Sequence, residues 1–305
     1  MRAMRHVVLA ALTLFAQART ATPPPPDTEI FLAPLSTRDG ALTIGPPIDI
    51  TNSPGYDNQP SFTPDGRSIL FTSVRGSSAD GPSQTDIYRY DASSGTIARV
   101  TNTPDGEYSP TVTPDGAHIS VIRQYPDTTQ ELWQFTMDGT QRSRLLTAKP
   151  VGYHAWIDDH TVALFVLGQP ATLQLADTRS DTSEIVARGI GRSLQRIPGG
   201  QTISFVERAG ADATATLTVR ELDPKTRRVT PLVDAVAGAK EADCAWTPDG
   251  MLLMAEKDVL YGWRRGDSTW RRVADLAALG LHGVSRLAVS PTGDRIAIVA
   301  AGSRP

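Results

Sequence analysis

The chain carries one four-residue phrase three times, as Thr63-Pro64-Asp65-Gly66, Thr113-Pro114-Asp115-Gly116 and Thr247-Pro248-Asp249-Gly250. Proline fixes φ at the first central position of a type I turn, aspartate favours the next position, and glycine tolerates the positive φ that ends the turn. An apolar residue precedes each copy and a short apolar run follows it. The phrase therefore predicts a tight hairpin between two strands, repeated along the chain.

Degenerate copies of this turn lie between and after the clear ones. They are Trp156-Ile157-Asp158-Asp159-His160, Arg196-Ile197-Pro198-Gly199-Gly200 and Val289-Ser290-Pro291-Thr292-Gly293. The six turns then follow one another at intervals of 40 to 50 residues, which is the length of one four-stranded propeller blade. The stretches between the turns alternate, as in Asp86-Ile87-Tyr88-Arg89-Tyr90-Asp91, and such alternation is typical of half-buried strands. The pattern predicts an all-β chain.

The two ends of the repeat region complement each other. After the sixth turn only one further strand fits, at 295–299, so the last blade lacks two strands. Two strand-like stretches at 29–33 and 42–51 precede the first turn and belong to no blade. We expect them to complete the last blade, because a closed ring leaves no long exposed edge, whereas an open solenoid needs polar capping repeats that this sequence does not show. The predicted fold is a six-bladed β-propeller of four-stranded antiparallel blades over 29–305, its last blade closed by N- and C-terminal strands.

The N-terminal residues have the pattern of a leader. Two arginines precede the apolar stretch 7–16, which ends in the small-x-small sequence Ala16-Gln17-Ala18. Ten apolar residues are too few to span a bilayer and suit a cleaved secretory signal peptide. We expect a signal peptide at 1–21 and a proline-rich spacer at 22–28, with the mature protein in the periplasm or secreted.

Composition excludes several classes of function. The net charge of the 305 residues is −3, which does not favour binding to nucleic acid or to an anionic membrane. The single cysteine, Cys244, permits no internal disulfide, and its neighbours Ala245 and Trp246 predict that it is buried and inert. His154 and His160 flank a predicted hairpin and are expected in turns, and no histidine pair has zinc-binding spacing. The chain has no Gly-x-Ser-x-Gly motif, phosphate loop or dinucleotide fingerprint.

The first full repeat carries a family resemblance. It runs Pro60-Ser61-Phe62-Thr63-Pro64-Asp65-Gly66-Arg67-Ser68-Ile69-Leu70-Phe71-Thr72-Ser73, continues through Asp86-Ile87-Tyr88, and ends in Gly95-Thr96-Ile97-Ala98-Arg99-Val100-Thr101. This closely resembles the TolB-type, WD-like β-propeller repeat. The resemblance covers the whole mature chain and is strongest in blades one, two and five. It implies a periplasmic or secreted, non-enzymatic scaffold that binds a protein partner across one propeller face.

Two departures limit what the resemblance implies. TolB has an α/β domain ahead of its propeller, whereas only about thirty residues precede the first full blade here. The resemblance is therefore to the propeller, and a role in the Tol–Pal system does not follow from it. The same repeat also forms the propeller of prolyl-oligopeptidase-type peptidases, whose separate hydrolase domain has no counterpart after blade six.

The candidate binding residues are predicted from their position. The first strand of each blade lines the channel of a propeller, so residues five to seven places before each turn should gather at one mouth. They are Asp57, Asn58, Gln59, Glu107, Tyr108, Ser109, Tyr153, Arg192, Ser193, Glu241, Asp243, Ser285 and Arg286. Convergent polar groups around a concave mouth are the usual form of a ligand site, although they also suit a water-filled channel. The four acids could hold a hard cation such as Ca²⁺, and no other cofactor is expected.

Three functions remain open at this level. The favoured one is an exported, monomeric, non-enzymatic propeller that binds a protein partner in the cell envelope, without nucleic acid and without a membrane span. The alternative is a secreted propeller enzyme, or a small-molecule or glycan binder, acting at the channel mouth through acids such as Asp57 and Glu107. The third is a structural part of a larger peptidase system.

Overall fold

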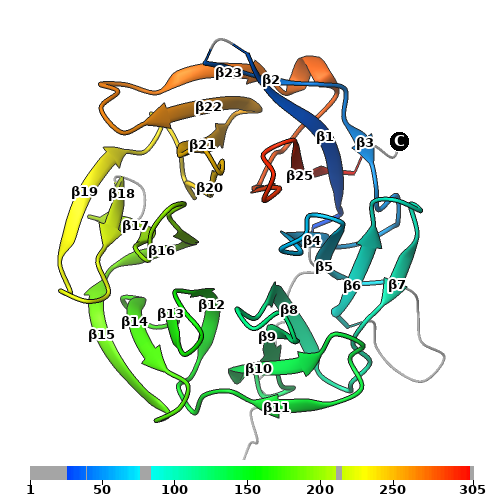
Figure 1. The fold of residues 1–305 in the computed structure, drawn as a ribbon, viewed down its shortest axis with the longest axis vertical. Helices are drawn as coiled ribbons and strands as arrows, with labels where there is room; N and C mark the ends of the chain where they lie inside the picture. The colour runs from blue at the N-terminus through cyan, green and yellow to red at the C-terminus, as the bar shows by residue number, and fades with distance from the viewer. Residues whose placement is uncertain (1–25, 39, 76–83, 211–214, 303–305) are drawn as a thin grey trace, which may run out of the picture.

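The computed structural model describes residues 26–38, 40–75, 84–210 and 215–302. The predicted signal peptide and most of the proline-rich spacer lie outside these residues. Within the described part of the chain, strands form one five-stranded and five four-stranded sheets. Figure 1 shows these sheets as six blades around a central axis, which confirms the all-β propeller.

The first three blades follow the chain order, with the innermost strand first. Blade 1 contains β4 (Asp57–Phe62), β5 (Ser68–Ser73), β6 (Asp86–Asp91) and β7 (Ile97–Arg99). Blade 2 contains β8 (Gly106–Val112), β9 (His118–Gln124), β10 (Gln130–Thr136) and β11 (Arg142–Arg144). Blade 3 contains β12 (Val151–Trp156), β13 (Thr161–Val166), β14 (Thr172–Asp177) and β15 (Thr182–Arg188).

The remaining blades complete the circle. Blade 4 contains β16 (Ile190–Arg196), β17 (Ile203–Ala209), β18 (Thr216–Leu222) and β19 (Val229–Asp234). Blade 5 contains β20 (Cys244–Trp246), β21 (Met251–Glu256), β22 (Val259–Arg264) and β23 (Arg271–Asp275), and the short 3₁₀ helix η2 (Ala277–Leu279) follows it. Blade 6 contains β24 (Arg286–Val289), β25 (Arg295–Ala301), β1 (Thr28–Arg38) and β2 (Ala41–Ile44), with β3 (Ile48–Asp49) also paired to β1.

Each Thr-Pro-Asp-Gly phrase forms the turn between the first two strands of its blade. In blade 1, the Thr63 hydroxyl donates a hydrogen bond of 2.6 Å to Asp65 Oδ1, and the Gly66 N–H donates to the Thr63 carbonyl at 2.8 Å. Gly66 has a φ of 67°, in the region that favours glycine. Blades 2 and 5 repeat the same pair of hydrogen bonds. The sequence prediction for these turns is therefore confirmed.

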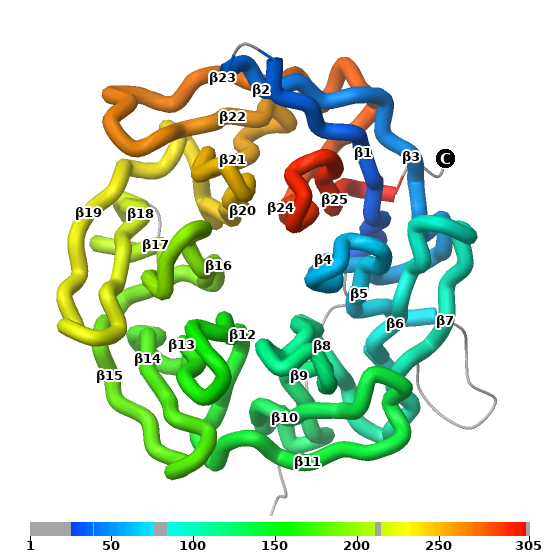
Figure 2. Tube along the Cα trace, in the orientation of Figure 1, coloured from blue at the N-terminus to red at the C-terminus, as the bar shows by residue number. Residues whose placement is uncertain are grey.

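The ring closes through blade 6. β1 runs antiparallel to β25, from the pair Thr28–Ala301 to the pair Pro34–Arg295. Figure 2 shows the blue β1 beside the red β25, as expected from the unassigned strands at the two ends. β1 is longer than predicted because it continues beyond β25 and pairs with β2.

The hydrophobic core lies between neighbouring blades. Ile69 and Phe71 of blade 1, for example, pack with Val299 of blade 6 in one cluster of buried side chains. Such contacts between sheets stabilise the ring because each blade buries both faces against its neighbours. Among the described residues, no helix is both long and apolar enough to cross a membrane.

The sequence expectations for the cysteine and for two histidines have different outcomes. Cys244 is buried in β20, and burial raises the pKa of its thiol, as expected for an inert cysteine. His160 lies outside the strands, in the turn between β12 and β13. The expectation for His154 was wrong: it lies within β12 and is buried. Its Nε2 lies 2.7 Å from Ser120 Oγ in β9 of the neighbouring blade.

Candidate functional site

The central channel is surrounded by the innermost strand of each blade. These strands are β4, β8, β12, β16, β20 and β24 (Figure 2). Register shifts interrupt β4 between Asn58 and Ser61, and β8 between Tyr108 and Thr111. At these bulges Gln59 and Ser109 have φ values of 56° and 52°. Non-glycine residues seldom adopt this region, and bulges that contain them re-aim side chains near functional sites.

The bulge of β4 lets Gln59 join three blades. Its Oε1 accepts hydrogen bonds of 2.8 Å from the Ser109 N–H and from the Thr72 hydroxyl. Its Nε2 donates to the Tyr153 hydroxyl of blade 3 at 3.4 Å. Gln59 therefore orients the phenol of Tyr153 from the side of blade 1.

Tyr153 also contacts the opposite side of the ring. Arg286 of blade 6 donates a hydrogen bond of 2.7 Å from Nη2 to the Tyr153 hydroxyl, and its guanidinium lies 5.0 Å from the centre of the Tyr153 ring. Asp243 Oδ1 of blade 5 lies 3.6 Å from Arg286 Nη1, and its Oδ2 accepts a hydrogen bond from the Leu287 N–H. Burial raises the pKa of Asp243, and Arg286 opposes this effect. Tyr153 and Arg286 thus form a bridge across the channel.

Cavities lie on both sides of this bridge. The cavity toward the turns that join the first two strands of each blade, which we call the turn-side chamber, has a volume of about 510 Å³. It extends from the bridge to Pro198, Pro248 and Pro291. The cavity toward the beginnings of the inner strands, the start-side chamber, has a volume of about 740 Å³ and is lined by Tyr56 and by residues of the bridge. A smaller cavity of about 440 Å³ adjoins Tyr56 and Tyr108 on the same side.

Most of the predicted residues do face the channel. The turn-side chamber is lined by Gln59, Ser109, Tyr153, Arg192, Ser193, Asp243 and Arg286, among others. Asn58, Glu241 and Ser285 line the start-side chamber, and Tyr108 lines the smaller cavity. The channel therefore gathers polar side chains from all six blades.

Asp57 and Glu107 do not line any of these cavities in the described part of the chain. Asp57 is 1 % exposed, its Oδ1 lies 3.2 Å from Arg75 Nη2, and burial raises its pKa to about 6. Glu107 is fully buried, accepts a hydrogen bond of 2.5 Å from the Thr103 hydroxyl, and has a pKa raised by burial to about 7. Side chains of a strand alternate in direction, so these positions point between blades while their neighbours face the channel.

The four acids are accordingly dispersed. Glu241 pairs with Arg192 at 2.8 Å and Asp243 adjoins Arg286, while the carboxylates of Asp57 and Glu107 are buried elsewhere. Among the described residues, no three His, Cys, Asp or Glu side chains are grouped so that they could hold a metal ion. The geometry does not support the hypothesis that these acids form a Ca²⁺ site.

Ser120 and His154 are the pair that most resembles a catalytic arrangement. His154 Nε2 lies 2.7 Å from Ser120 Oγ, but Ser120 already donates to the Thr111 carbonyl and accepts from the Trp156 indole. The single hydroxyl proton of Ser120 has two competing acceptors, the Thr111 carbonyl and His154 Nε2, so the direction of the Ser120–His154 hydrogen bond depends on the tautomer of the imidazole ring. Burial lowers the pKa of His154 to about 4, and Ser120 is fully buried. The pair is therefore structural.

Comparison with known proteins places the fold. No family model matches the sequence, and no curated protein matches it significantly. A protein assigned as TolB from Agrobacterium tumefaciens superposes with a TM-score of 0.68 at 16 % identity, over 91 % of this chain and 99 % of that one. The fold is similar to that of TolB.

Two further structures support this placement. TolB from Acinetobacter baumannii gives a TM-score of 0.57 at 16 % identity, over 92 % of this chain and 66 % of that one. A chain of the nidogen–laminin complex gives 0.56 at 13 % identity, over 80 % and 91 % of the two chains. At these identities the likeness extends to the fold, and the function has to be argued from the site.

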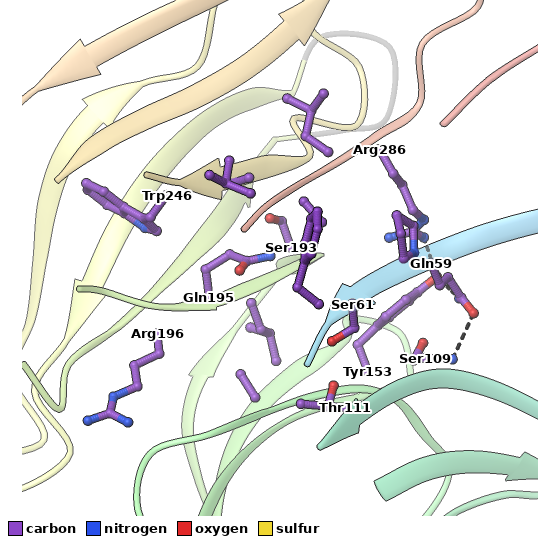
Figure 3. Close-up of a pocket in the computed structure, with 18 of the residues that line it drawn as sticks. Gln59, Ser61, Ser109, Thr111, Tyr153, Ser193, Gln195, Arg196, Trp246 and Arg286 are labelled. Atoms are coloured by element: carbon purple, nitrogen blue, oxygen red, sulfur yellow. Dashed lines mark hydrogen bonds between the residues drawn. The ribbon is translucent and has the colours of Figure 1, made fainter. Parts of the chain in front are cut away.

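The structure shows further channel residues that the sequence prediction omitted. Tyr56 lines the start-side chamber, and burial raises its pKa to about 12. Trp156, Trp246 and Arg196 line the turn-side chamber, where Figure 3 shows Arg196 and Trp246 across the view from Arg286 and Tyr153. The sequence prediction covered the positions five to seven places before each turn. Trp156, Arg196 and Trp246 lie closer to the turns, at the ends of the inner strands. Because they directly precede the predicted turns, the sequence could have indicated that they lie at the turn-side end of the channel.

Proposed function

We propose that this protein is an exported, non-enzymatic β-propeller that binds a protein partner in the cell envelope through the turn-side chamber. The observation that carries the proposal is the lining of that chamber, in which Trp156, Trp246 and Tyr153 are combined with Arg192, Arg196 and Arg286. Tryptophan, tyrosine and arginine are the side chains most enriched among the residues that dominate binding energy at protein interfaces.

Three further features support the proposal. The fold resembles that of TolB, the N-terminal sequence has the pattern of an export signal, and the Ser–His pair of blades 2 and 3 is unsuited to nucleophilic catalysis. The chamber extends to the turns of blades 4, 5 and 6, at Pro198, Pro248 and Pro291, so a partner segment can enter it there without displacing a blade. Bulges and hydrogen bonds across the channel hold its wall in place before a partner arrives, which lowers the entropy lost on binding.

A pull-down with the purified mature chain tests this proposal. The tagged protein is exposed to an envelope extract of the source organism, beside an Arg196→Met variant and a matched Arg179→Met variant. Arg179 lies just beyond the end of β14 and does not line the turn-side chamber, and its one ion pair among the described residues is with Asp177. We expect a partner that the wild type and Arg179→Met retain and Arg196→Met loses. Recovery of no protein above background, or equal recovery by all three, would contradict the proposal.

A second candidate function rests on the start-side chamber. Its volume of about 740 Å³ lies within the ~300–1,000 Å³ typical of small-molecule sites. The phenol of Tyr56 and the Arg192–Glu241 pair line it, so a small polar molecule or a glycan could bind there. Thermal-shift screening with such compounds tests this candidate, with Tyr56→Phe as the variant that should abolish any stabilisation.

A further inference from the structure

The turn-side chamber is lined by more positively charged than negatively charged side chains. Its lining contains the three guanidinium groups of Arg192, Arg196 and Arg286, but only one carboxylate, that of Asp243. His154 also lines this wall and is neutral at pH 7, because burial lowers its pKa to about 4. The chamber therefore carries an excess of positive charge inside a protein whose net charge is −3.

The arginines differ in how much of their charge is already compensated. Arg192 pairs at 2.8 Å with Glu241, and Arg286 has Asp243 at 3.6 Å. Arg196 has no carboxylate partner among the described residues, and its Nε donates to the Gly200 carbonyl at 3.0 Å. The ends of its guanidinium thus remain available to an anion. Because the guanidinium fork matches the geometry of a carboxylate, such an anion can be held by two parallel hydrogen bonds.

The bottom of the chamber also presents groups that favour an anion. Arg286 contacts Tyr153 through one Nη and Asp243 through the other, at a separation longer than a hydrogen bond, so several of its five N–H groups are not committed. The buried Ser109 hydroxyl lines the same cavity and has no hydrogen-bond partner among the described residues.

Between these two ends the wall combines apolar side chains with polar ones such as Ser61, Thr111 and Gln195. Phe62, Trp246 and Leu287 line it together with the prolines of the turns. In Figure 3, Arg286 and Arg196 lie on opposite sides of the chamber, with Trp246 and Gln195 on the wall beside Arg196. A ligand that complements this wall has two acidic groups with an apolar group between them.

We propose that the turn-side chamber recognises an acidic segment of the partner polypeptide, in which one carboxylate binds Arg286 at the bridge and a second binds Arg196 near the turns, with an apolar side chain between them. The inference rests on the proposed function, since it assigns the chemistry of the segment that the same chamber binds. It also explains why Arg196 replaces the apolar residue that precedes most of the other turns.

Peptide titration tests the charge requirement without an identified partner. The probes are acetyl-Glu-Leu-Glu-amide and its uncharged counterpart acetyl-Gln-Leu-Gln-amide, added to the purified mature chain. Binding is followed by tryptophan fluorescence, because Trp156 and Trp246 line the chamber, and by calorimetry. We expect the acidic peptide to bind at least ~10-fold more tightly than the amide, since each charge-assisted pair is worth more than a neutral hydrogen bond, and to bind more weakly as salt rises.

Variants locate the site. Arg196→Met should weaken acidic-peptide binding by ~10-fold, while Arg286→Lys, which keeps the charge and loses the fork, should weaken it less. Arg179→Met should bind as the wild type does, and circular dichroism verifies that all variants are folded. Equal binding of the two peptides, no saturable binding of either, or unchanged binding by Arg196→Met would overturn the inference. So would succinate binding as tightly as the peptide, because the ligand would then be a small acid.

The two proposals fail separately. If the pull-down recovers a partner that depends on Arg196 but the acidic and amide peptides bind equally, the partner-binding function stands and the acidic character of the segment is rejected. If the pull-down recovers nothing and the acidic peptide still binds through Arg196, the ligand chemistry stands and the envelope partner is rejected.

Discussion

The indole N–H of Trp246 donates a hydrogen bond of 2.8 Å to Ser204 Oγ across the boundary between blades 5 and 4. Trp156 and Ser120 repeat this contact at 2.9 Å between blades 3 and 2. At the other four boundaries the strand register places Leu70, Ala163, Leu253 or Ala297 at the position of the serine, and the position of the tryptophan holds Val112, Arg196, Val289 or Phe62. Serine therefore occurs in a blade where the next blade has tryptophan, because a buried indole N–H needs an acceptor.

This relationship predicts an energetic coupling. Ser204→Ala leaves the indole N–H of Trp246 buried without an acceptor, which should lower the free energy of unfolding by about 1–3 kcal/mol. In a Trp246→Phe background the same substitution should cost much less, since no indole remains. Urea denaturation of the four proteins of this double-mutant cycle measures the difference. If Ser204→Ala lowered the free energy of unfolding equally in the wild type and in Trp246→Phe, the hydrogen bond between Ser204 and Trp246 would not explain why the two residue types occur together.

Glu107 predicts a pH dependence of stability. Burial raises its folded-state pKa to about 7, above that of an exposed glutamate, so the folded state binds the proton more tightly than the unfolded state does. Its contribution is fully present below about pH 4.5 and is lost as the pH rises through 7, by about 3 kcal/mol. Relative to Glu107→Gln, the wild type should therefore lose stability between pH 5 and pH 8. A difference in unfolding free energy that stays constant over this range would exclude an ionisable buried Glu107.

His154 predicts the opposite dependence. Burial lowers its pKa to about 4, so the unfolded state, with a pKa near 6.5, binds the proton more tightly. The stability that neutral His154 provides is present above about pH 6.5 and is lost as the pH falls toward 4, by about 3 kcal/mol. His154→Gln keeps a polar side chain beside Ser120 and removes the titration. Its unfolding free energy should fall less than that of the wild type between pH 7 and pH 4.5, and parallel curves would contradict the assignment.

Closure of the ring predicts a strong effect at the N-terminus. Removing 28–51 deletes β1, β2 and β3 and exposes β25 along its whole length. We expect the truncated chain to lose cooperative thermal unfolding, as measured by calorimetry. Ile30→Ala is a graded version, because Ile30 is fully buried in the cluster that joins blades 6 and 1, and it should cost about 2–5 kcal/mol. A truncated protein that melts like the intact chain would contradict the closure.

The parts of the fold that the sequence predicted depend on local signals. The turn at Thr63 to Gly66 follows from the conformational preferences of four adjacent residues. The pairing of β1 with β25 followed from counting strands against a fixed blade length, which needs no knowledge of contacts. Both features could therefore be predicted without a structure.

The site was less predictable because it depends on bulges and on distant pairs. Asp57 and Glu107 fell within the predicted window, but the alternation of the strand turns them between blades, while the bulges at Gln59 and Ser109 re-aim the residues that follow. Tyr153 and Arg286 are separated by 133 residues, and no local pattern indicates their contact. The same holds for His154, whose partner Ser120 lies in another blade.

Site-specific photo-cross-linking tests the central claim most directly. A benzophenone amino acid is placed at Gln195, which lines the turn-side chamber, or at Ile185, an exposed residue of the outer strand β15. Each protein is irradiated in the envelope extract, and covalent adducts are identified by mass spectrometry. Partner binding through the turn-side chamber predicts an adduct from position 195 that excess acidic peptide prevents, and none from position 185. An adduct from position 185 alone, or none from either position, would contradict the account.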